Sequence, residues 1–100
     1  MTEIERLEKA ILDLHGCKGK HARSVPIHET FEGQTVWQGV VEVFNLENHP
    51  QAKIAYAWSY KGDDAKTHYV AVLGVPPVNS AEDAVRSYVV SESRKQFRPS

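Results

Sequence analysis

Apolar residues recur at helical spacing near the start of the chain. They fall at steps of three and four residues, which predicts an amphipathic helix over residues 3–15. Thr2 and Glu5 form a Thr-x-x-Glu capping box in front of it. Gly16 can take the left-handed conformation that ends a helix. The apolar stripe consists of Ile4, Leu7, Ile11 and Leu14.

A second helical pattern lies near the end of the chain, over residues 81–94. Ser80 can cap it, and Glu82 and Asp83 place negative charge in its first turn, where the helix dipole favours it. Its apolar positions are Ala81, Ala84, Val85, Tyr88 and Val89.

Between the helices the chain is rich in β-branched and aromatic residues that alternate with polar ones. This pattern predicts strands at 36–45, 53–60 and 67–75. Residues 24–31 predict a shorter strand, and Pro26 places it at a sheet edge because proline cannot donate to a ladder. Residues 17–24 are polar and aperiodic, and we expect a loop there.

The order of these elements predicts an α+β fold. Short connections indicate a three- to four-stranded antiparallel meander, flanked by an N-terminal and a C-terminal helix. Both helices are expected to cover one sheet face, leaving the other solvated or bound to a partner. The expected core comprises Ile4, Leu7, Ile11, Leu14, Val41, Val43, Val85 and Val89.

Length and composition are those of an ordinary globular domain. The chain has 100 residues, with 41% hydrophobic and 25% charged, which predicts one domain over residues 1–100 whose basic tail frays from about residue 95. A net charge of −1 gives no bulk attraction to nucleic acid. Cys17 is the single cysteine, and no apolar run is long enough to span a membrane, so we expect a cytoplasmic protein.

Three aromatic residues share one side of a predicted strand. Tyr56, Trp58 and Tyr60 are two residues apart, with Ala55 and Ala57 on the other side. We expect the aromatic row to be core. The alternative is an outward-facing surface for stacking or dimerisation.

Histidine, cysteine and glutamate offer weaker signals. His15, Cys17 and His21 have a spacing that three zinc ligands can adopt, but a structural site needs a fourth, so we predict no metal and no cofactor. Cys17 with His21 is a possible nucleophile–base pair. Glu42 and His68 are a possible acid–base pair, although polar residues in strands usually mark a solvated face.

Basic residues gather in two clusters, each near a helix end. The first contains Lys18, Lys20, His21 and Arg23, and the second contains Arg94, Lys95 and Arg98. Together they could bind phosphates, although a charge run is usually only a solvated surface. The element order resembles that of double-stranded-RNA-binding domains in topology. That family has a basic start to its second helix, whereas the start here, at residues 80–83, is acidic.

The sequence therefore favours a non-enzymatic binding or protein-interaction module that forms a homodimer through a sheet surface or strand edge. An unknown protein or small molecule is a further expected partner, and neither nucleic acid nor a membrane is expected. The first alternative is a small-molecule or metal-dependent enzyme that uses the His, Cys and Glu residues, and the second is weak nucleic-acid binding through the basic clusters. The candidate binding residues are Lys18, Lys20, His21, Arg23, Glu42, Tyr56, Trp58, Tyr60 and His68.

Overall fold

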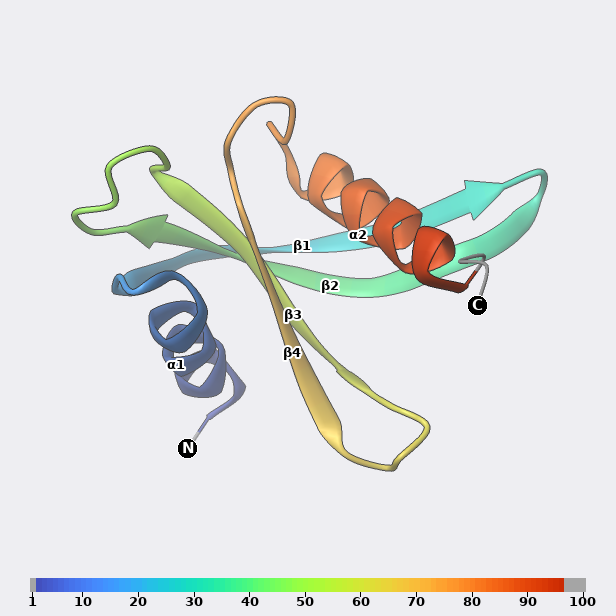
Figure 1. Cartoon of the computed structure of the whole chain (residues 1–100), viewed down its shortest axis with the longest axis horizontal. Coiled ribbons are helices and arrows are strands. Elements are labelled where there is room, and N and C mark those ends of the chain that lie inside the picture. The colour runs from blue at the N-terminus through green and yellow to red at the C-terminus, as the bar shows by residue number, and fades with distance from the viewer. Residues whose placement is uncertain (1, 97–100) are drawn as a thin grey trace.

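A computed structural model describes residues 2–96 of the chain, and the side chains up to residue 92. Two helices flank four antiparallel strands in meander order, β1-β2-β3-β4, which confirms the predicted α+β architecture (Figure 1). The elements are α1 (Glu3–His15), β1 (Gly19–Phe31), β2 (Gln34–Leu46), β3 (Ile54–Lys61), β4 (Thr67–Leu73) and α2 (Ala81–Gln96).

The helix boundaries follow the capping signals. The Glu5 amide donates to the Thr2 hydroxyl at 3.2 Å, and Gly16 ends α1 with a φ of 70°. The Asp83 amide donates to the Ser80 hydroxyl at 3.1 Å at the start of α2. Residues 97–100, the end of the expected frayed tail, lie outside the described residues.

The loop expected at residues 17–24 is wrong, because β1 already begins at Gly19. Lys20 pairs with Asn45, and Arg23 with Val43, across a bulge at residue 22. The long partner strand β2 recruits this polar segment into the ladder, although its composition alone gives no strand signal. Pro26 lies on β1, an edge strand, as predicted.

The sheet consists of two hairpins that diverge. β1 and β2 pair along their whole length, whereas β2 and β3 pair only from Glu42↔Ala57 to Asn45↔Ile54. In Figure 1 the β3–β4 hairpin accordingly points down and the β1–β2 hairpin points right. The distal half of the β1–β2 hairpin therefore extends beyond β3 and β4.

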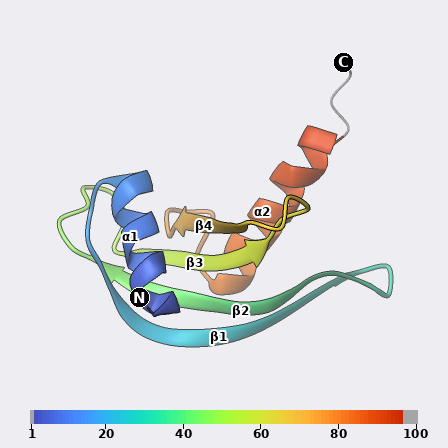
Figure 2. The same cartoon turned by 90° about the horizontal axis from the view of Figure 1, so that it is seen from below.

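The two helices cover opposite faces of the sheet, so the expectation of one shared face is wrong (Figures 1 and 2). We call the two clusters the α1 core and the α2 core. Successive strand residues point to opposite faces, so both parities of β3 are buried. The α1 core contains Leu7, Ile11, Cys17, Phe44, Ala55 and Ala57. The α2 core contains Ile27, Val41, Val43, Tyr56, Trp58, Ala81, Ala84 and Val85.

Most of the expected core is buried, with one clear exception. Leu7, Ile11, Val41, Val43 and Val85 are at most 1% exposed, while Ile4 and Val89 are partly buried. Leu14 is 60% exposed and does not belong to the core. It lies on the side of the helical stripe nearest Ala10, one turn beyond it, and is not among the residues that pack in the α1 core.

Candidate functional site

The candidate residues form separate groups rather than one pocket. Tyr56 and Trp58 are 3% and 2% exposed and lie in the α2 core, as expected, while Tyr60 is 41% exposed. Trp58 packs edge-on against Trp37 and against Tyr88, with ring centroids 5.5 and 5.4 Å apart. The Trp58 indole N–H has no hydrogen-bond partner in the described structure. Perpendicular rings beside an indole allow its N–H to point at a ring face.

Tyr56 on β3 and Tyr88 on α2 both pack in the α2 core, and burial raises the pKa of each phenol. Asp83 and Glu82, near the start of α2, raise the pKa of Tyr56 further, and Arg23 opposes them. A hydrogen bond with Tyr60 adds to the increase in the pKa of Tyr88. The rings of both residues pack in the α2 core, where Tyr88 contacts Trp58 edge-on.

Glu42 pairs with His21, not with His68. His21 Nε2 lies 2.9 Å from Glu42 Oε1, and the Ser24 hydroxyl donates to the same oxygen. The bulge at residue 22 brings His21 and Ser24 to one face of β1, above Glu42 on β2. The Glu42 side chain is 15% exposed and that of His21 30%. Ser24 was not among the predicted residues, because its place beside Glu42 depends on the strand register.

The geometry of this cluster differs from that of an activated nucleophile. In a hydrolytic triad the histidine stands between the nucleophile and the carboxylate. Here both His21 and Ser24 bind the carboxylate, so His21 is not placed to remove the Ser24 proton. The cluster links β1 to β2, and it contains no proton relay from Ser24 through His21 to Glu42.

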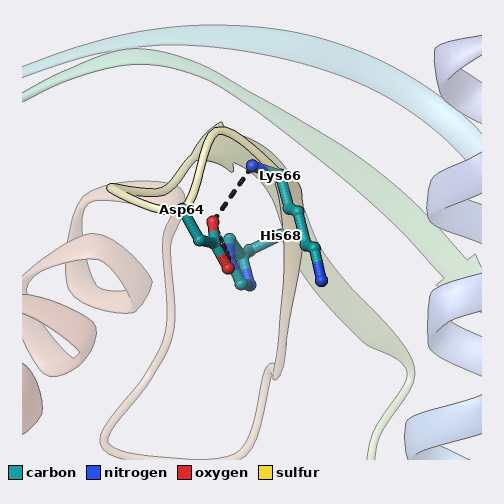
Figure 3. A network of polar contacts seen from close by, with 3 residues as sticks. All are labelled: Asp64, Lys66 and His68. Atoms are coloured by element: carbon teal, nitrogen blue, oxygen red, sulfur yellow. Dashed lines mark hydrogen bonds and ion pairs between the residues drawn. The ribbon is translucent and has the colours of Figure 1, made fainter.

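His68 belongs to the tip of the β3–β4 hairpin, where Figure 3 shows it beside Asp64. Its Nε2 lies 3.1 Å from Asp64 Oδ1, and its ring stacks on Tyr60 with centroids 5.3 Å apart. A Cβ on Gly62 would come within 2.7 Å of the ring, so glycine makes room for the stack. The Lys66 amide and His68 both hydrogen-bond Asp64 and lower the pKa of its carboxyl.

The other sulfur and imidazole groups are engaged separately. Cys17 is free and only 8% exposed, within the α1 core. His15 binds the Ala71 carbonyl, and His49 accepts bonds from the Gln51 and Ala52 amides. Among the described residues, no three His, Cys, Asp or Glu side chains are grouped to hold a metal ion.

The basic residues at the start of β1 do not form one patch. Lys18 and Lys20 border an open groove of about 470 Å³ beside α1, together with the carboxylates of Glu5, Glu8 and Glu47. Arg23 lies near Tyr56. Of the second basic cluster, the side chains of Arg94 and Lys95 and the whole of Arg98 lie outside what the structure describes.

The two edges of the sheet differ in chemistry. β1 carries Pro26, charged residues and a bulge, which are the usual protections of an exposed edge. β4, from Thr67 to Leu73, carries none of Asp, Glu, Lys or Arg and includes Val70 and Val72. Such an edge is a template for pairing with another strand. The predicted meander order is confirmed and leaves this last strand at an edge, but the sequence analysis did not single out its lack of charged residues.

A second groove runs beside this edge, along α1. It has a volume of about 330 Å³ and is lined by Arg6, Lys9, Ala10 and Asp13 from α1 and by Tyr69 from β4. The sequence analysis did not single out these residues. Their signal was the spacing of Arg6, Ala10 and Asp13, which places them on one flank of the helix.

Within residues 2–96 no helix is long and apolar enough to cross a membrane. No protein-family model, no curated protein and no solved structure matches the chain.

Proposed function

We propose that this chain is a non-enzymatic protein-interaction module that works as a homodimer. The observation that carries the proposal is the outer edge of β4, a strand without Asp, Glu, Lys or Arg, while the opposite edge of the sheet is protected. An unprotected edge of this kind exposes backbone donors and acceptors that a second strand can satisfy. A second copy of the chain is the most economical source of that strand.

The distal β1–β2 hairpin offers a second surface for a different protein. Phe31, Val36 and Val40 are 67%, 45% and 50% exposed there. α2 packs on the face of this hairpin that carries Ile27 and Trp37. Val40, next to Val41 of the α2 core, points to the other face, whereas Phe31 shares the face of Ile27 at the end of β1. Exposed apolar side chains beyond the cover of a helix are typical of protein contact surfaces.

Catalysis is less well supported than binding. The Glu42 carboxylate holds both His21 and Ser24 without forming a relay, and His68 lies in another hairpin. The three grooves at α1 are lined by none of these four residues. The cytoplasm is the proposed location, since a free, buried Cys17 suits a reducing compartment.

Light scattering on the full chain tests the homodimer. We expect a particle of twice 11.2 kDa at micromolar concentration, which dissociates on dilution. A clean 11.2 kDa monomer over a wide concentration range would contradict the proposal.

A further inference from the structure

The direction of each backbone group on β4 follows from two hydrogen bonds at its ends. The Gly74 amide donates to the Ile54 carbonyl at 2.7 Å, and the Gly62 amide donates to the Lys66 carbonyl at 2.9 Å. Bonded pairs alternate along an antiparallel ladder, so the even-numbered residues of β4 bond to β3. The outward-facing residues are therefore Thr67, Tyr69, Ala71 and Leu73.

Part of this outward edge is already occupied within the chain. His15 Nε2 donates to the Ala71 carbonyl at 2.9 Å, and the Val75 amide donates to the Leu73 carbonyl at 2.9 Å. The backbone N–H and C=O groups of Thr67 and Tyr69 point outward and remain available for a new strand. These two residues lie on the half of β4 nearer the hairpin tip. A carbonyl has two lone pairs, so Ala71 can accept a second bond beside that of His15.

Helix α1 runs beside β4 in the same direction. At its start Glu3 accepts a hydrogen bond from Ser59, which pairs with Tyr69, and at its end His15 reaches Ala71. The flank of α1 that lines the groove at Tyr69 carries Ala10 at its centre. A β4 strand of a second copy, added at Tyr69, therefore brings its own α1 against this flank.

Two opposite charges on this flank lie about one helical turn on either side of Ala10, and Lys9 lines the groove between them. Arg6 precedes Ala10 by four residues and Asp13 follows it by three. Neither side chain makes an ion pair within the described part of the chain. Leu14 continues the flank one turn beyond Ala10 and is 60% exposed, although it belongs to the apolar stripe of the helix.

We propose that a second copy of the chain docks here, edge to edge, with a two-fold axis between the two Ala10 residues and the two Tyr69 residues. This inference rests on the proposed homodimer and names its interface. The two β4 strands pair antiparallel, the Tyr69 residues exchange backbone bonds, and each Thr67 meets Ala71 of the second copy. The sheet then continues across the axis.

The same rotation makes the two α1 flanks complementary. Helices that run antiparallel about Ala10 place Arg6 of one copy opposite Asp13 of the other, twice. The small Ala10 side chain lets the helices approach closely. Leu14 packs over the aliphatic stem of Arg6 of the second copy, which explains why an apolar stripe residue is exposed in one chain alone. A peptide of unrelated sequence would not be expected to match the spacing of Arg6, Ala10 and Asp13. This spacing therefore favours a second copy of the chain as the occupant.

A matched pair of leucines tests which flank of α1 forms the interface. Leu12 and Leu14 are both exposed on α1, at 45% and 60%, but lie on opposite flanks. Leu14→Lys should weaken the dimer by at least about tenfold in dissociation constant, because it removes apolar contact and faces Arg6 of the second copy. Leu12→Lys should leave the dissociation constant unchanged. The measurement is sedimentation equilibrium, with circular dichroism to show that each variant is folded.

A charge swap tests the pairing itself. Arg6→Asp and Asp13→Arg should each weaken the dimer, and the double variant should restore it. Both changes suit the helix dipole, with acid near the start and base near the end, so helix weakening does not explain a loss. A dimer insensitive to Leu14→Lys and to both charge reversals, but broken by Val40→Asp, would overturn this interface and keep the proposed homodimer. A monomeric wild-type chain would overturn both.

Discussion

At the scale of single residues, histidines that look alike in the sequence have different roles. His15 donates from Nε2 to the Ala71 carbonyl, whereas His49 Nδ1 accepts bonds from the Gln51 amide at 3.1 Å and the Ala52 amide at 2.9 Å. His21 instead contacts Glu42. Each role depends on a partner set by folding, so the spacing of histidines could not distinguish metal ligands from structural groups.

Asp64 gives a pH-dependent prediction at this scale. Hydrogen bonds from the Lys66 amide and with His68 hold the pKa of its carboxyl below the ordinary 3.8. A depressed pKa contributes stability that is present above 3.8 and is lost as the pH falls through the folded-state value. We expect the protection factors of the amides at the β3–β4 tip, which are exchange rates corrected for intrinsic chemistry, to fall at acid pH.

The variant Asp64→Asn removes the titrating group and serves as the control. Its exchange rates at the tip, corrected for intrinsic chemistry, should change less with pH in the acid range than those of the wild type. Equal pH dependence in the two proteins would show that the Asp64 carboxylate does not stabilise the turn.

At the scale of elements, local signals predicted the helices well and the strands less well. The caps at Thr2, Gly16 and Ser80 are short-range, and α1 spans the predicted residues 3–15. β1 begins five residues earlier than the predicted 24–31, because its first part is a strand only through pairing with β2. The sequence did not predict which helix packs on which face of the sheet. The alternation of side chains along a strand assigns them to two faces, but it does not show which helix lies on each face.

In the candidate site, too, local sequence predicted some features, whereas others depend on how the strands pair. Tyr56 and Trp58 are core, which their residue type favoured. The contact of Glu42 with His21 follows from the register of β1 on β2 and from the bulge at residue 22. Such a register is not encoded in a window of neighbouring residues.

The α1 stripe gives a prediction at the scale of one element. Leu7 is 1% exposed in the α1 core, so Leu7→Ala should lower the free energy of unfolding by about 2–5 kcal/mol. Leu12→Ala, on the exposed side of the same helix, should change it by less than about 0.5 kcal/mol. Urea denaturation at fixed protein concentration measures both. Equal losses would show that α1 packs differently on the sheet.

At the scale of the whole molecule, the two cores share the same two central strands. β2 contributes Val43 to the α2 core and the adjacent Phe44 to the α1 core, and β3 contributes Tyr56 and Ala55 in the same way. Neither core can lose its strands without disrupting the other. The molecule should therefore unfold in one cooperative transition, although its helices lie on opposite faces.

The tryptophans allow a direct test of this coupling, because Trp37 and Trp58 both lie on the α2 side of the sheet. Ile11 is fully buried on the other side, in the α1 core. Ile11→Ala should lower the denaturation midpoint equally by tryptophan fluorescence and by circular dichroism, with a loss of about 2–5 kcal/mol. The fluorescence change would then report damage transmitted through β2 and β3. A fluorescence midpoint that stays at the wild-type value while part of the dichroism is lost earlier would show that α1 unfolds separately from the α2 core.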